Sequence, residues 1–159
     1  RDYDKALEQY KLAFNAEKRD DKIYNLIGSV LLYRAEMKLG ISERFQKGIV
    51  LSEITLDKID EEERLNIQND IKQAYEWLNL AIKQVNPIIN AYYNYSKACI
   101  YDSLFLGGGS PKMSEADKYL NTVEIIWNMN DSQKPKGYLY TRRNYWEANK
   151  EYDKALEIN

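Results

Sequence analysis

One hexapeptide occurs twice in this chain, once near each end. Tyr3–Glu8 and Tyr152–Glu157 both read Tyr-Asp-Lys-Ala-Leu-Glu. Tyr3 and Ala6 of the first copy and the following Tyr10 lie on one face of a helix, because residues three, four and seven apart share a face. Repetition of an amphipathic helical unit restricts the chain to architectures built from stacked helices.

Small residues also recur at a fixed distance. Ala6 and Gly28 are separated by 22 positions, and so are Ala74 and Ser96. Gly28 lies in YNLIGSVL, and Ser96 lies in YYNYSKAC, so each small residue is flanked by aromatic and aliphatic residues at helical spacing. Small side chains at such positions allow two helix backbones to approach closely, because a larger side chain would clash.

These motifs resemble the tetratricopeptide repeat, a pair of antiparallel helices with a period of about 34 residues. The resemblance implies an all-α fold in which antiparallel helical hairpins stack as a right-handed superhelix, an α-α solenoid. The last unit departs from the family pattern, because Arg142 and Arg143 stand in place of its leucine and glycine. The alternative is a bundle of unrelated amphipathic helices.

The resemblance predicts a single domain over residues 1–159, with Pro87, Pro111 and Pro135 each at a candidate boundary. The units are the second helix of a first repeat at 1–18, a repeat with elongated helices at 20–86, a repeat with a glycine-rich loop (106–111) at 88–129, and a last partial repeat at 136–159.

Residues 41–73 break the period and form either a degenerate repeat or elongated helices. We favour elongated helices, because Asp60 is suited to cap a helix and Glu61–Glu63 to form its acidic first turn. Neither glycine nor proline occurs in residues 60–85. The pattern predicts a long helix over these residues, with a shorter helix over 42–56 packed beside it.

The stretch Leu106–Pro111 contains three glycines and predicts a loop between two helices, with Ser114 as the N-cap of the second. Glycine-rich loops before helices also occur in phosphate-binding sites. The spacing of a P-loop is missing, however, and Lys112 is not followed by Ser or Thr. We therefore interpret the stretch as a turn.

Composition argues against several classes of function. A net charge of −2 does not favour nucleic acid as a partner. Because histidine is absent, a Ser-His or Cys-His arrangement cannot form within this sequence, and the one cysteine, Cys99, falls on a packing face. We expect no enzymatic activity, no metal and no cofactor. We also expect no membrane segment and a cytoplasmic location, since no apolar run reaches about 18 residues.

The resemblance implies a binding surface, because the first helices of successive tetratricopeptide units line a concave groove. The candidate groove residues are tyrosines, asparagines and one lysine: Asn25, Tyr33, Tyr93, Lys97, Tyr101, Tyr140 and Asn144. We expect the four tyrosines to be exposed. A subgroup of the family grips a terminal carboxylate with lysine and asparagine. That clamp is incomplete here, because Asn25 and Ser29 match Asn94 and Lys97 of the next unit.

These features predict a scaffold or adaptor that binds a peptide or protein partner in the groove. The alternative is a regulatory module that senses a ligand or peptide within a larger signalling or transcription-regulating protein. Self-association through the solenoid ends is also expected, because an end helix without its mate exposes an apolar face.

Overall fold

The computed structural model describes residues 2–16, 22–128, 134–149, 154 and 157–158, and these residues contain helices and no strand. The α-helices are α1 (Tyr3–Asn15), α2 (Ile23–Leu39), α3 (Ile41–Lys47), α4 (Glu61–Ile82), α5 (Ile89–Phe105), α6 (Gly109–Trp127) and α7 (Lys136–Ala148). Two short 3-10 turns, η1 (Leu51–Glu53) and η2 (Leu56–Lys58), lie between α3 and α4. The expected all-α class is confirmed.

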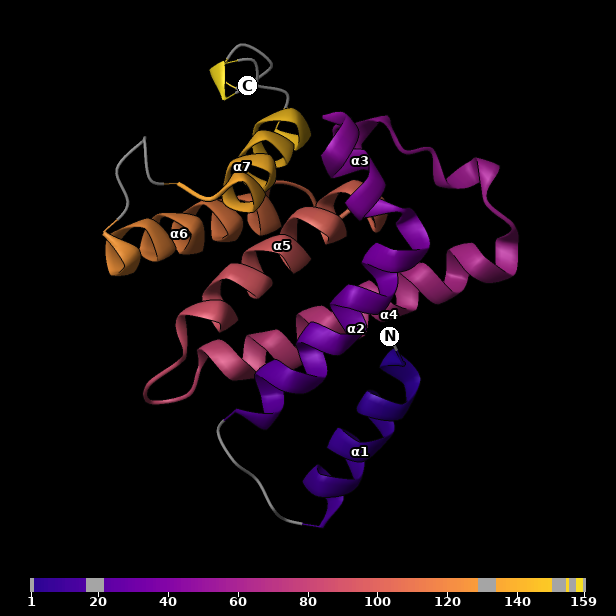
Figure 1. Ribbon diagram of the computed structural model, residues 1–159, viewed down its shortest axis with the longest axis vertical. Helices are drawn as coiled ribbons and strands as arrows, with labels where there is room; N and C mark the ends of the chain where they lie inside the picture. The colour runs from indigo at the N-terminus through magenta and orange to yellow at the C-terminus, as the bar shows by residue number, and fades with distance from the viewer. Residues whose placement is uncertain (1, 17–21, 129–133, 150–153, 155–156, 159) are drawn as a thin grey trace.

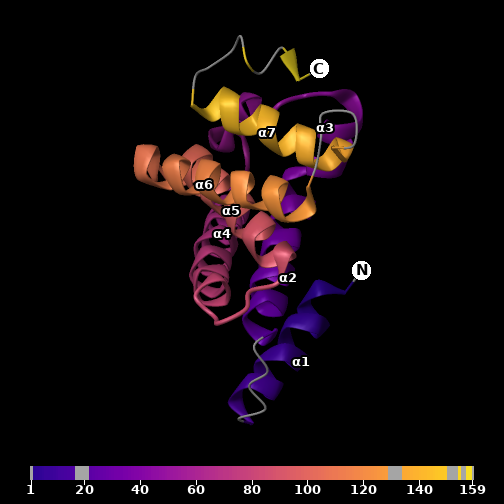
Figure 2. The same ribbon diagram turned by 90° about the vertical axis from the view of Figure 1, so that its left-hand side faces the viewer.

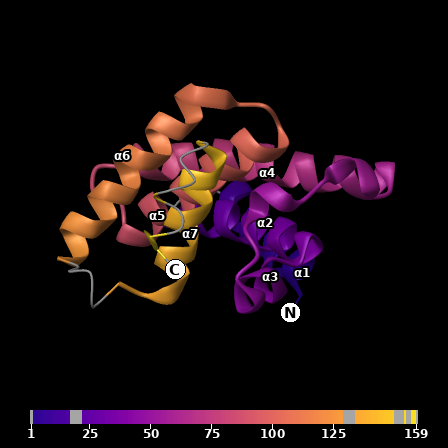
Figure 3. The ribbon, with the colours of Figure 1, turned by 90° about the horizontal axis from the view of Figure 1, so that it is seen from above.

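The helices pack mainly on their neighbours in the chain. α1 packs on α2, α2 on α4, α4 on α5, and α5 on α6, while α5 also contacts both α2 and α7. The molecule is elongated, with α1 at one end, α6 and α7 at the other, and α2, α4 and α5 between them (Figures 1 and 2). In the view from above, α4 and α6 lie along one side, and α2, α3 and α7 lie toward the other (Figure 3).

Gly28 lies where α2 crosses α4 at short range. A Cβ atom at this position would lie 2.5 Å from Leu78 Cγ and 3.2 Å from the Leu78 backbone nitrogen. Ile27 and Leu31, which flank the glycine on the same helix, are fully buried, as are Ala74 and Leu78 on α4. The prediction that a small residue marks a close approach of two helices is confirmed at this position.

The long helix of the sequence prediction is present as α4. Its cap is Asp60, whose carboxylate accepts a hydrogen bond from the Glu63 backbone N–H at 3.4 Å. Asp70, in the middle of α4, is buried and accepts two hydrogen bonds from the Arg34 guanidinium of α2, at 2.6 and 2.9 Å. Burial of a carboxylate requires such a partner, so this pair fixes α4 against α2.

The predicted loop at 106–111 is longer than the observed one. α6 begins at Gly109, so only Leu106–Gly108 lie between α5 and α6. Ser114 lies inside α6 and is not its N-cap, contrary to the prediction. Pro111 falls in the first turn of α6, where proline is tolerated because the first N–H groups of a helix have no partner within it.

Only the first half of the predicted helix over 42–56 is present, as α3. Gly48, which follows α3, has a φ of +69°, a conformation that favours glycine and terminates a helix. Residues 41–59, here called the insert, comprise α3 followed by non-helical chain with two 3-10 turns. α3 contacts α2, η1 contacts α7 and η2 contacts α4. The insert therefore bridges elements that are far apart in the sequence.

The second copy of the hexapeptide, Tyr152–Glu157, lies mostly outside the described residues, and so does most of the second helix predicted for the last unit. Among the helices that the structure describes, none combines the length and the apolar composition needed to cross a membrane.

Candidate functional site

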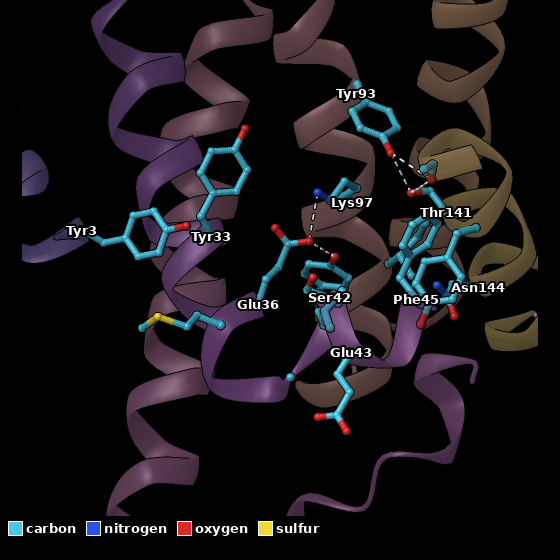
Figure 4. Close-up of a pocket in the computed structure, with 17 residues that line it drawn as sticks. Tyr3, Tyr33, Glu36, Ser42, Glu43, Phe45, Tyr93, Lys97, Thr141 and Asn144 are labelled. Carbon is cyan, nitrogen blue, oxygen red and sulfur yellow. Dashed lines mark hydrogen bonds and ion pairs between the residues drawn. The ribbon is translucent and has the colours of Figure 1, made fainter. Parts of the chain in front are cut away.

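A groove of about 690 Å³ lies between α1, α2, the insert, α5 and α7 (Figure 4). We call it the aromatic groove, because rings from all five elements line it. Its main lining residues are Tyr3, Tyr33, Glu36, Met37, Ser42, Phe45, Tyr93, Lys97, Ile100, Tyr101, Gly137, Tyr140, Thr141 and Asn144. Six of the seven candidates named from the sequence are among them, and Asn25 is not.

An ion pair between α2 and α5 forms the centre of the aromatic groove. Lys97 Nζ lies 2.9 Å from Glu36 Oε2, and the Tyr101 hydroxyl donates to the same oxygen at 2.5 Å (Figure 4). The side chains of Lys97 and Glu36 are only 13% and 16% exposed. Lys97 Nζ also lies over the rings of Tyr33 and Tyr93, 5.7 and 5.5 Å from their centroids, which is within cation–π range.

The protonation states at this centre follow from burial and from the neighbouring carboxylate. Burial is the largest single effect on Lys97 and lowers its pKa. The charge and hydrogen bond of Glu36, together with Tyr93 and Tyr33, outweigh burial, so the pKa of Lys97 is raised. Burial and Glu36 both raise the pKa of Tyr101 well above its ordinary value. At neutral pH, Lys97 is therefore charged and Tyr101 is a neutral hydrogen-bond donor.

Tyr93 joins the floor of the aromatic groove to its α7 wall. Its hydroxyl lies 2.9 Å from Thr141 Oγ1 and 3.2 Å from the carbonyl oxygen of Gly137. Its ring stacks on Tyr138 with the centroids 6.3 Å apart. Burial is the main reason that the pKa of Tyr93 is raised. The hydroxyl of Tyr93 is thus used within the protein, while its ring faces Lys97.

The α7 wall holds the insert through three side chains. Asn144 Oδ1 accepts from the Leu51 backbone N–H at 2.7 Å. The Tyr140 hydroxyl donates to the Ile49 carbonyl at 2.5 Å, and the Arg143 guanidinium donates to the Gly48 carbonyl at 2.7 Å. The polar atoms of Tyr140 and Asn144, two of the candidate partner-binding residues, therefore bind the chain itself. The insert closes the groove along this edge.

Exposure divides the candidate tyrosines. Tyr33 is 37% exposed and its ring lies 6.3 Å from that of Tyr3. Tyr93 and Tyr140 are half-buried. Tyr101 is buried, contrary to the expectation that it would be exposed, because its hydroxyl reaches inward to Glu36. Met37, which the sequence did not single out, is 59% exposed and extends the open rim beside Tyr33.

Asn25 lies outside the aromatic groove because its side chain faces α5. It is buried, and its Oδ1 accepts from the Ser29 hydroxyl at 3.3 Å. Asn94 of α5 in turn donates to Ser29 at 2.8 Å. These three polar side chains satisfy one another at the α2–α5 contact, which corrects the prediction of Asn25 as a partner-binding residue.

Arg142, one of the two arginines that depart from the tetratricopeptide motif in the sequence, is buried between α6 and α7. Its guanidinium is buried against α6 and donates to Asp117 at 2.7 Å and also to Asn121. Its Nε donates to the Tyr138 hydroxyl at 3.1 Å. Arg142 therefore forms a polar junction between α6 and α7.

Among the groove residues that were not predicted, Glu36 could have been identified from its spacing in the sequence. It follows Tyr33 by three residues, so both lie on one helix face. No sequence pattern identifies Phe45 and Ser42 as groove residues, because their position depends on the path of the insert. Nor does any pattern identify Tyr3, because the docking of α1 beside this face depends on tertiary contacts.

Groups with metal-binding or nucleophilic chemistry do not converge in the described part of the chain. No cluster of three His, Cys, Asp or Glu side chains occurs there. Cys99 is fully buried, and burial raises the pKa of its thiol to about 12, so the reactive thiolate is scarce at neutral pH. Comparison of the chain with protein-family models, with curated proteins and with solved structures found no match.

Proposed function

We propose that this protein is an interaction module that binds an extended segment of a partner polypeptide in the aromatic groove. The observation that carries the proposal is the convergence of Tyr33, Tyr93 and Lys97 on one groove beside an exposed rim. The groove is lined by α2, α5 and α7, and α5 contacts both of the others. This succession is what a tetratricopeptide-like solenoid would present to a partner.

The exposed rim supplies surface that a partner would bury. Tyr3, Tyr33 and Met37 offer two rings and a thioether, the side-chain types that are enriched in the buried centres of protein interfaces. Full burial of one such side chain is worth about 1.5–3 kcal/mol. Met37 and Tyr33 together would therefore contribute a few kcal/mol, enough to set the affinity of a small interface.

The test is a selection of binding peptides from a random-sequence display library, followed by calorimetric titration of the selected peptides. Met37→Glu places a charge on the rim and should weaken binding by about tenfold or more, since an apolar contact is lost and a charge is desolvated. Leu65→Glu is the matched control, because Leu65 is 55% exposed on α4 and lies outside the groove. Failure to select any peptide, or equal binding by both variants, would contradict the proposal.

A ligand-sensing regulatory module is a second candidate, and the size of the groove favours it. Its volume of about 690 Å³ falls within the range of about 300–1,000 Å³ found for small-molecule sites. A small ligand that binds there would raise the melting temperature of the wild type and not that of Met37→Glu. Stabilisation by small molecules without any selected peptide would favour this alternative.

A further inference from the structure

We propose that the aromatic groove recognises a basic side chain, arginine or lysine, of the partner segment. The inference rests on the proposed function and names the chemistry of the residue that the groove would take. Glu36 and the ring of Tyr33 carry it, with the ring of Tyr3 beside them.

One of the two carboxylate oxygens of Glu36 has no partner within the described residues. Lys97 and Tyr101 both bind Oε2, and within the described residues no hydrogen bond or ion pair reaches Oε1. Arg143 Nε is the one fully buried side-chain polar atom of the described part that lacks a partner, so Glu36 Oε1, which also has none, is not fully buried. Figure 4 shows this oxygen on the side of the carboxylate that faces Tyr33. The groove therefore presents an unused acceptor on a mostly buried carboxylate.

Tyr3 and Tyr33 line the same groove as Glu36. Tyr33 is exposed, and Tyr3 lies beside it with the ring centroids 6.3 Å apart. The opposite side of Tyr33 already faces the Lys97 ammonium, 5.7 Å from the ring centroid. A cation is attracted to the face of an aromatic ring, because the ring carries partial negative charge above and below its plane. Rings beside a carboxylate oxygen suit a guanidinium or an ammonium group.

The charges at the centre of the groove favour a cationic ligand over an anionic one. Lys97 is the cation that lines the groove in the described residues, and its charge is already neutralised by Glu36 at 2.9 Å. A carboxylate that approached Lys97 would meet the second oxygen of Glu36. A cation would meet that oxygen as its acceptor, although Lys97 screens part of the attraction. We expect a preference of about tenfold for a cation over a neutral residue, within the range of partly desolvated cation–π and ionic contacts.

The test uses heptapeptide pools that are acetylated and amidated at their ends, so that the termini carry no charge. The central residue is Arg, Lys, Gln or Glu, and the other positions are random uncharged residues. Fluorescence anisotropy measures binding of each pool to the wild type. The Arg and Lys pools should bind about tenfold more tightly than the Gln pool, and the Glu pool should bind most weakly.

Two variants test the assignment. Glu36→Gln keeps an acceptor for Lys97 and Tyr101 but removes the charge, and it should abolish the preference for Arg over Gln. Glu76→Gln is the control with the same charge change, on the exposed side of α4. Because Glu36 is mostly buried, Tyr33→Leu serves as a second variant that keeps an apolar side chain at an exposed position. It should also reduce the preference.

Three outcomes are distinguishable. A basic preference that is lost in Glu36→Gln and Tyr33→Leu but kept in Glu76→Gln supports the inference. Binding without a basic preference, or with a preference that neither variant changes, overturns the inference and leaves the proposed function intact. If no pool binds and no peptide is selected, the proposed function fails and this inference fails with it.

Discussion

At Gly28, α2 has no room for a side chain, whereas Gly137 at the start of α7 has ample room. An added Cβ at Gly28 would lie 2.5 Å from Leu78 Cγ. At Gly137 the nearest atom would be the Tyr93 hydroxyl oxygen, at an ordinary contact distance of 3.9 Å. The two glycines therefore differ in the space around them, and substitution by alanine should affect the free energy of unfolding differently at each position.

Gly28→Ala should lower the free energy of unfolding by about 1–3 kcal/mol, because overpacking outweighs the helix propensity of alanine, which is worth about 1 kcal/mol. Gly137→Ala should leave stability unchanged or raise it by up to about 1 kcal/mol. Urea denaturation of the two variants and the wild type measures both effects. A stabilising Gly28→Ala would show that α2 and α4 do not approach each other as described.

At the scale of elements, the insert is held by side chains rather than by a helix or sheet of its own. Val50 and Leu51 are buried, and the Leu51 N–H has the side-chain oxygen of Asn144, Oδ1, as its acceptor. A buried N–H without an acceptor costs about 1–3 kcal/mol. Asn144 therefore decides whether residues 48–51 stay on α7.

Asn144→Ala should release this part of the insert without unfolding the helices. We expect the hydrogen exchange of the Leu51 amide to accelerate by about tenfold or more, since loss of about 1–3 kcal/mol acts on local opening. Amides in the middle of α4, such as that of Ile71, should exchange as in the wild type. Asn90→Ala, at an exposed position of α5, is the control. Unchanged protection at Leu51 would contradict the role assigned to Asn144.

At the scale of the whole molecule, the interior is rich in tyrosine. The chain has 14 tyrosines, and five of those in the described part have a raised pKa for which burial is the main cause: Tyr93, Tyr95, Tyr101, Tyr138 and Tyr140. Cys99, which interacts with Tyr95, has a pKa of about 12 against an ordinary value of 9.0. These groups stay protonated in the folded state at a pH where the unfolded chain has already lost the protons.

The stability of the protein should therefore fall in alkali. A group whose pKa is raised on folding contributes stability that is complete below its unfolded pKa and is lost as the pH rises through its folded pKa. We expect the free energy of unfolding to fall by about 2 kcal/mol or more between pH 8 and pH 11, measured by urea denaturation. Cys99→Ala removes one titrating group and should flatten the profile. A pH-independent free energy would contradict this burial.

How far the sequence predicts the site depends on the element concerned. Tyr33, Tyr93 and Lys97 reach the aromatic groove from α2 and α5, whose helical phase is readable from the sequence because it depends on neighbours three or four residues away. Tyr140 and Asn144 also lie there, but their polar atoms bind the insert, more than 90 residues away in the chain. No local pattern encodes such a contact.

The sequence by itself determined the all-α class, the position of α4 and the role of Gly28. Amphipathic period, small residues and the cap at Asp60 carry these predictions, and each acts over one or two helical turns. Only the tertiary structure decided that Leu51 docks on Asn144 of α7, that Tyr101 turns inward to Glu36 and that Asn25 joins Ser29 and Asn94 at the α2–α5 contact. These outcomes depend on which distant groups satisfy buried polar atoms, and that choice is made by packing rather than by local sequence.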